Sequence, residues 1–208
     1  SVVYAGARLG SSDTYFPALM AFYGFGAAIG AVLVPSLVRR APERLVMSAG
    51  TSLFAAVGIV FAMLPTPTLP VLALVWGGFG LASSLVLTPG GLVITRSARK
   101  QDRAAVFAAQ FSLSHAVWLV AYPMAGWMAS SLSLETAMLL LCVMSLAVTL
   151  TALRVWPAHD PLERAHAHPE LRPDHPHLRE IAATGPDNRH IHSFKIDDLH
   201  PHWSDKAV

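Results

Sequence analysis

Histidine is the residue type whose number and spacing in this 208-residue chain most clearly predict chemistry. Nine of the ten histidines lie in the last 52 residues, where eight of them form four H-x-H pairs. The nine are His159, His166, His168, His175, His177, His190, His192, His200 and His202. In an extended segment or a turn, both rings of a pair can reach one ion, and imidazole suits Ni, Co, Cu and Zn. The pattern predicts a divalent-metal site, to which Asp160, Asp174, Asp187, Asp197 and Asp198 could add oxygen ligands; alternatively, the histidines only buffer protons in a solvated tail.

The tenth histidine, His115, lies inside a long apolar segment instead of the polar tail. At 100° per residue on a helix, it shares one face with Ser112 and Tyr122. An ionisable group at membrane depth is costly and marks a functional site, and imidazole exchanges protons near pH ~6.5. We expect His115, Ser112, Tyr122 and Gln110 to contribute to a transport pathway or proton relay. The structural alternatives are a ring held by Ser112 or a backbone carbonyl, and a packing hydrogen bond for Gln110.

Five apolar segments must hold these side chains, since a bilayer core of ~30 Å needs about 20 helical residues. They cover residues 14–38, 45–64, 71–95, 104–128 and 136–153. None contains Asp, Glu, Lys or Arg, and charged residues make up 13% of the chain, against roughly 25% in soluble domains. The sequence therefore predicts an all-α integral membrane domain with five transmembrane helices over residues 1–156. Seven prolines interrupt the polar tail over residues 157–208, which is predicted to be largely disordered. The exception is residues 190–203, which could form a short strand or dock against the cytoplasmic face of the membrane domain.

The basic residues alternate between the loops and thereby set the orientation of the chain. Loops after the first, third and fifth segments carry Lys or Arg, whereas the two intervening loops carry neither. Positive residues stay on the cytoplasmic side, so the tail is predicted to be cytoplasmic. The composition argues against a soluble enzyme and against a nucleic-acid-binding protein. With no nucleotide-binding loop and no triad spacing in the sequence, we expect no enzyme activity and no required cofactor.

Small residues and prolines inside the segments predict how the helices pack and where they open. Gly26 and Gly30 form a G-x-x-x-G pattern, which lets helices approach closely in lipid. The run Pro89-Gly90-Gly91 is expected to loosen the third helix, and such breaks are tolerated where neighbouring helices or a water-lined cavity satisfy the backbone. These five residues are therefore assigned to helix packing or gating.

The loop after the first segment resembles a signature of the Major Facilitator Superfamily. In that family, a loop of the type G-x-L-A-D-R-x-G-R-R follows the second helix of each six-helix half. Residues 35–44 read PSLVRRAPER, so that Leu37, Arg40 and Arg44 match, while prolines replace the glycines and Arg39 replaces the acid. The resemblance implies that the five segments are helices eight to twelve of twelve, with Arg40 and Arg44 in a gating loop. It also implies that the N-terminal half is missing from a chain that begins without methionine.

A second stretch is similar to the eleventh helix of bacterial efflux members of this superfamily, some of which are nickel-resistance transporters with histidine-rich tails. It reads RSA at residues 96–98, FAAQFSLSH at residues 107–115 and YPMAGW at residues 122–127. The resemblance implies proton-coupled efflux of a small solute across the bacterial inner membrane, with the lipid bilayer and the missing half as partners. The first candidate substrate is a divalent metal such as nickel or cobalt. The alternatives are an exporter of a drug or metabolite with an incidental tail, and a membrane-anchored metal-binding or sensing protein.

Overall fold

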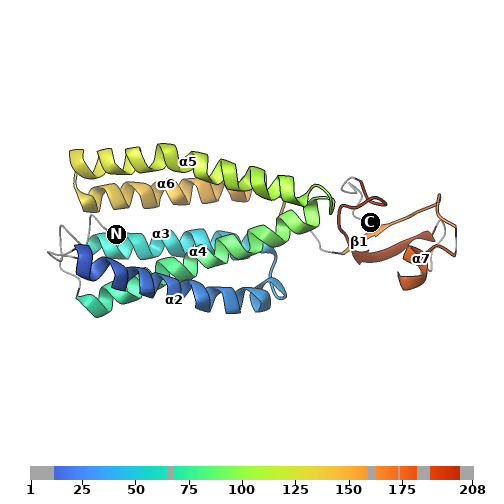
Figure 1. Cartoon of the computed structure of the whole chain (residues 1–208), viewed down its shortest axis with the longest axis horizontal. Helices are drawn as coiled ribbons and strands as arrows, with labels where there is room; N and C mark the ends of the chain where they lie inside the picture. The colour runs from blue at the N-terminus through green and yellow to red at the C-terminus, as the bar shows by residue number, and fades with distance from the viewer. Residues whose placement is uncertain (1–11, 65–67, 159–162, 173, 182–187, 202–208) are drawn as a thin grey trace. The chain divides into compact units, whose positions relative to one another are not determined.

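The computed structural model of the chain describes residues 12–64, 68–158, 163–172, 174–181 and 188–201. Within these residues, five long helices carry the apolar segments (Figure 1). They are α2 (Ser12–Val38), α3 (Glu43–Met63), α4 (Leu69–Ser97), α5 (Arg103–Ser131) and α6 (Leu134–Val155). Each is long and apolar enough to cross a bilayer, which confirms the predicted all-α membrane domain. Every helix begins one or two residues before its predicted segment.

The ends of α6 show how local sequence sets these boundaries. The Ser133 hydroxyl accepts a hydrogen bond from the backbone N–H of Thr136 at 3.1 Å and so caps the helix. Glu135 lies in the first turn and Arg154 in the last turn, where a negative and a positive charge, respectively, interact favourably with the helix dipole. The helix is therefore specified by its polar ends as well as by its apolar middle.

The helix α4 runs without interruption through Pro89, Gly90 and Gly91, where the sequence predicted a loosened segment. The Pro89 side chain is fully buried, so neighbouring residues pack around the ring and hold this part of the helix in place. In lipid, surrounding helices commonly compensate for the hydrogen bond that a proline removes. A proline and two glycines were therefore not sufficient to predict a break.

Glycines bring the backbones of α2 and α4 together. A Cβ atom at Gly26 would overlap the backbone carbonyl of Gly77 in α4. A Cβ atom at Gly30 would lie 2.6 Å from the Cβ of Ser84, also in α4. Both glycines of the G-x-x-x-G pattern thus lie where α2 approaches α4, and close backbone approach is a main source of helix packing in lipid.

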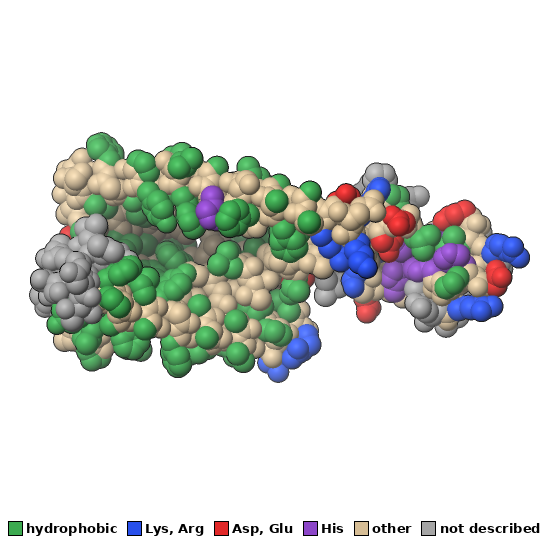
Figure 2. Space-filling model, viewed as in Figure 1, with side chains coloured by type: hydrophobic (Ala, Val, Ile, Leu, Met, Phe, Trp, Pro, Cys, Tyr) green, Lys and Arg blue, Asp and Glu red, His purple; other side chains and the backbone are tan. Residues whose placement is uncertain are grey.

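The other helices present apolar side chains outward, as a bilayer requires (Figure 2). On α5, for example, Leu113 and Val117 are exposed. The helices α3 and α6 pack along each other, and the Thr149 hydroxyl of α6 donates a hydrogen bond to the Thr51 hydroxyl of α3 at 2.9 Å. The outer surface of this domain is therefore apolar, with a polar contact inside.

The chain divides into two compact units, and the one that contains the tail also takes in Val93–Ala109. In the tail, β1 (Glu163–His166) pairs antiparallel with β2 (His190–Ser193), and the short helix α7 (Pro176–Ile181) contacts β2. After β2, the backbone N–H of Ile196 donates a hydrogen bond of 3.0 Å to the carbonyl of Arg96, near the end of α4. The strand β2 lies where the sequence predicted one.

The described part of the tail is more regular than the largely disordered segment that the sequence predicted. Its buried side chains are Leu178, Phe194 and Ile196 together with three imidazoles. The edge of the Phe194 ring packs on His166, with ring centroids 5.3 Å apart. Histidine rings thus fill most of an interior for which the sequence supplies few apolar residues.

Candidate metal centre

Among the described residues, six tail histidines meet in one group, here called the imidazole cluster (Figure 2). Its members are His166, His168, His177, His190, His192 and His200. The pairing of β1 with β2 places His166 opposite His190. Because side chains alternate along a strand, His190 and His192 project from the same face of β2. The helix α7 supplies His177, and the segment after β2 supplies His200.

The Nε2 atoms of the imidazole cluster converge. Four pairs of them are separated by 2.9 to 3.2 Å: His166 and His200, His168 and His200, His177 and His190, and His166 and His192. Two overlapping sets of four rings have all their ligand atoms within 4.8 Å of one another. The first set is His166, His168, His177 and His200, and the second is His166, His177, His190 and His192.

In five of the six rings, the Nδ1 atom faces the opposite way, toward an oxygen atom. His168 donates to the Glu170 carboxylate at 2.9 Å, and His200 donates to the Asp197 carboxylate at 2.8 Å. His166, His190 and His192 donate to the backbone carbonyls of Arg164, Asn188 and Ser193, at 3.1, 2.7 and 2.9 Å. Carbonyl and carboxylate oxygens only accept, so Nδ1 carries the hydrogen and Nε2 offers a lone pair. Metal-binding histidines commonly have their tautomer and direction fixed in this way.

The surroundings favour neutral rings. Burial lowers the pKa of His166 and of His177 to about 4, and repulsion from the other rings acts in the same direction. Burial also lowers the pKa of His190 and of His200, although the Asp197 carboxylate partly opposes the shift at His200. Neutral imidazole is the form that binds a metal, so these shifts keep ligands available below the usual pKa of histidine.

Two carboxylates orient the rings. The hydrogen bond from His168 lowers the pKa of Glu170. Burial raises the pKa of Asp197, but hydrogen bonds from the backbone and ring of His200 lower it on balance. The sequence predicted that Asp197 could be an oxygen ligand; the structure instead places its carboxylate on Nδ1 of His200, away from the Nε2 atoms. Glu170 was not predicted, although its position two residues after an H-x-H pair was a usable signal.

Asn188 connects the two segments that carry the cluster, and sequence reasoning missed it. Its side-chain amide donates to the carbonyls of His168 and Leu171, at 3.0 and 2.9 Å. Its own carbonyl accepts the Nδ1 hydrogen of His190. Its φ of 57° lies in the left-handed region, which asparagine tolerates better than most residues. An asparagine just before a strand is a typical turn residue, and that was the available signal.

Among the described tail histidines, His175 lies outside the cluster. The ring of His175 accepts a hydrogen bond from the backbone N–H of His177 at 3.3 Å, at the start of α7. His159 and His202 lie outside the described residues. The pairs 166/168 and 190/192 therefore contribute both rings, whereas the pair 175/177 contributes one.

In the membrane domain, His115 belongs to a row of rings on one face of α5. Its ring stacks on Phe111, with centroids 3.8 Å apart, and lies 4.3 Å from that of Trp118, which in turn neighbours Tyr122. Its Nδ1–H donates to the carbonyl of Phe111 at 2.8 Å, so Nε2 keeps its lone pair. The partner is thus a backbone carbonyl, and Ser112 is exposed.

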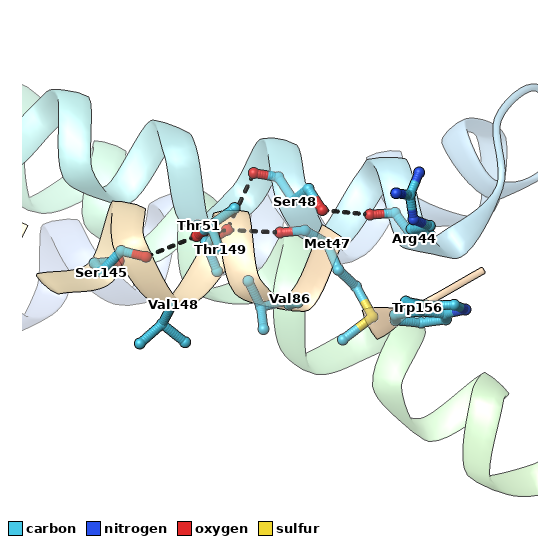
Figure 3. A pocket seen from close by; sticks show the side chains of 10 residues that line it. Arg44, Met47, Ser48, Thr51, Val86, Ser145, Val148, Thr149 and Trp156 are labelled. Carbon is cyan, nitrogen blue, oxygen red and sulfur yellow. Dashed lines mark hydrogen bonds between the residues drawn. The ribbon is translucent and has the colours of Figure 1, made fainter. Parts of the chain in front are cut away.

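The remaining predicted residues have other surroundings. Gln110 is exposed on α5, and Arg40 is exposed in the turn after α2. A pocket of about 280 Å³ lies beside α3 and α6, lined in part by Arg44, Thr51 and Thr149 (Figure 3). The Arg44 guanidinium donates to the carbonyl of Leu153 and so joins the ends of these two helices.

Comparison with known protein families matches residues 1–195 to the Major Facilitator Superfamily. The match covers well over half of the chain and includes all five long helices. No curated protein and no solved structure matches the chain.

Proposed function

Because the chain belongs to the Major Facilitator Superfamily of membrane transporters, we propose that it takes part in the export of a divalent transition metal, with Ni²⁺ and Co²⁺ as the first candidates. The observation that carries this proposal is the convergence of the Nε2 atoms in the tail, at separations down to 2.9 Å. Such a group of neutral imidazoles would hold a transition-metal ion before its export.

The remaining features of the mechanism follow from the same proposal. The tail lies in the cytoplasm of a bacterial cell, where it gathers ions before export across the inner membrane. Further helices complete the pathway, as in transporters built from two halves. His115 has a free Nε2 lone pair on α5 and is the candidate for carrying the proton that drives export.

A second candidate, export of an apolar drug-like solute, is favoured by a pocket of about 570 Å³ beside α2 and α4. Its lining is apolar and includes Phe22, Phe25 and Ile29. A pocket of this kind suits an apolar ligand better than a hydrated cation. The two candidate functions differ in the substrate that the protein exports, so a transport assay with both substrates distinguishes them.

The test measures uptake into everted membrane vesicles from cells that express the complete transporter. We expect an imposed pH gradient to drive uptake of radioactive Ni²⁺ or Co²⁺ above the level in vesicles without the protein. A fluorescent lipophilic dye serves as the competing substrate. Movement of the dye without movement of either metal would overturn the proposal in favour of the second candidate. Metal bound to the protein without uptake would identify a membrane-anchored metal-binding protein.

A further inference from the structure

The ring centres of the imidazole cluster are arranged like the corners of an octahedron. An octahedron has twelve edges, and twelve pairs of rings have centroids separated by 4.5 to 5.5 Å. The three remaining pairs are His166 with His177, His168 with His192, and His190 with His200. These pairs share no ring, so they are the three axes of the octahedron.

The separation along the first axis agrees with this arrangement. The centroids of His166 and His177 are 6.5 Å apart, further than those of any adjacent pair. Opposite corners of a regular octahedron are about 1.4 times as far apart as adjacent ones, which gives roughly 7 Å for edges of about 5 Å. The six ring centroids therefore surround one centre, while their ligand atoms fall into two overlapping four-ring sets that share His166 and His177.

The nitrogen atoms distinguish an octahedral site from a tetrahedral one. With a metal–nitrogen bond of ~2.1 Å, adjacent ligand atoms are about 3.0 Å apart in an octahedron and about 3.4 Å apart in a tetrahedron. The four short Nε2–Nε2 separations in the cluster are 2.9, 3.0, 3.1 and 3.2 Å, all on octahedral edges. Three of these separations lie closer to the octahedral value, and the fourth, between His166 and His192, lies midway between the two values.

Charge balance favours a divalent ion in the cluster. Six neutral imidazoles leave the two positive charges of the ion uncompensated, and unpaired charge is costly in a partly buried site. Glu170 and Asp197 each accept a hydrogen bond from Nδ1 of a cluster ring, at 2.9 and 2.8 Å. Two carboxylates thus supply two negative charges just outside the ligands. The site as a whole is neutral when it holds a divalent cation.

We propose that the tail binds one divalent ion in an octahedron of six imidazole nitrogens, and that the site selects Ni²⁺ and Co²⁺ over Zn²⁺. Zn²⁺ prefers four ligands, and Mg²⁺ and Ca²⁺ prefer oxygen. Ni²⁺ accepts six nitrogen donors and binds more tightly than Co²⁺ in the usual order of affinities. The site rests on its own geometry, but its role in choosing the exported ion rests on the proposed function.

The test uses the full chain purified in detergent, with Co²⁺ and then Ni²⁺ as probes. We expect one ion per chain, weak Co²⁺ absorption bands typical of octahedral ligation, and an X-ray absorption spectrum of bound Ni²⁺ that requires six nitrogen neighbours. Strong tetrahedral Co²⁺ bands, four neighbours around Ni²⁺, or two ions per chain would overturn the proposal. These spectra need no variant and do not depend on transport.

Substitutions separate the octahedral site from the two four-ring sets. If only the set His166, His168, His177 and His200 binds the ion, then His192→Ala has no effect. If only the set with His190 and His192 binds it, then His168→Ala has no effect. The octahedral site requires both variants to weaken Ni²⁺ binding at least tenfold, while the control His175→Ala leaves it unchanged. Unaltered affinity in either variant would overturn the proposal.

The binding and transport experiments test the octahedral site and the proposed function independently of each other. An octahedral ion in a protein that moves no metal would leave this site in place and refute the proposed function. Metal export by a protein whose tail binds tetrahedrally would refute the octahedral site alone.

Discussion

The Nε2 atoms of His166 and His200 lie 2.9 Å apart, although the two residues are separated by 34 positions in the sequence. Both rings carry their hydrogen on Nδ1, where it is donated to the carbonyl of Arg164 and to the carboxylate of Asp197. Two lone pairs therefore face each other, an unfavourable contact that a cation between them removes. The folded tail is consequently adapted to a bound positive charge.

Metal should stabilise the tail. At a free Ni²⁺ concentration about 100 times Kd, binding to the folded form alone adds about 2.7 kcal/mol to the free energy of unfolding of the tail. We expect this as slower hydrogen exchange of the β2 amides, reversed by a chelator. Amides in α3 serve as the internal control and should not respond. Unchanged exchange in β2 would show that the cluster does not bind the ion.

Acid should unfold the tail before it affects the membrane helices. The pKa of His166 and of His177 is lowered to about 4 in the folded state, against 6.5 in an unfolded chain. Between these values the unfolded tail binds more protons, so its free energy of unfolding falls as the pH is lowered. The stability is present above pH 6.5 and is lost progressively toward pH 4.

This pH dependence can be measured without metal, as the protection of the β2 amides after correction for intrinsic exchange rates. His166→Gln should make the dependence shallower, because the amide does not titrate. A tail that becomes more stable between pH 6.5 and pH 4 would contradict the sign of the shifts.

Asn188 should matter through its side chain and its backbone separately. Asn188→Ala loses two hydrogen bonds and places a Cβ-bearing residue at a φ of 57° without the local compensation of asparagine. Asn188→Gly loses the same bonds but adopts this φ easily. We expect both variants to bind Ni²⁺ more weakly, Asn188→Ala the more so, in a titration of the full chain. Equal affinities in all three proteins would mean that the turn does not position the cluster.

Gly26 and Gly24 offer a matched pair in α2. A Cβ at Gly26 would overlap the carbonyl of Gly77, whereas a Cβ at Gly24 has nothing within 4 Å. Gly26→Ala must separate α2 from α4 and should cost about 1–3 kcal/mol, as overpacking does. Gly24→Ala should be neutral or slightly stabilising. The thermal melting of the protein in detergent measures both, and similar melting temperatures for the two variants would argue against close packing here.

His115 can be tested by the difference between Gln and Ala. If the ring carries protons, both His115→Gln and His115→Ala abolish export driven by a pH gradient, because neither titrates. If the ring only holds the helix through its bond to the Phe111 carbonyl, Gln should preserve activity. We expect loss in both variants, with normal insertion into the membrane. Leu113→Ala, at an exposed position of α5 outside the predicted pathway, is the control and should keep transport.

The membrane domain was predictable because lipid imposes one rule on every span. A segment such as residues 136–153 must satisfy its backbone internally and present apolar side chains outward. The continuity of α4 at Pro89 was not predictable, since it depends on how tightly neighbouring residues pack around that ring. Hydropathy therefore located the helices but did not predict whether each helix is continuous at its prolines.

In the tail, residue type predicted the chemistry, whereas strand pairing determined the membership of the cluster. His175 and His177 look equivalent in the sequence, yet α7 begins between them, so that one ring receives a backbone hydrogen bond and the other enters the cluster. The approach of His166 to His200 depends on the β1–β2 register and on the turn at Asn188. Neither can be deduced from H-x-H spacing.

The hydrogen bond between the Ile196 N–H and the Arg96 carbonyl has a practical consequence for genetics. Deleting the tail removes the metal ligands and, at the same time, a backbone partner of the last turn of α4. A phenotype of the truncated protein would thus mix two defects, one in ion capture and one in the support of this helix end. Single replacements such as His192→Ala leave that backbone hydrogen bond intact. Such variants therefore test the role of the tail in metal resistance without the second defect.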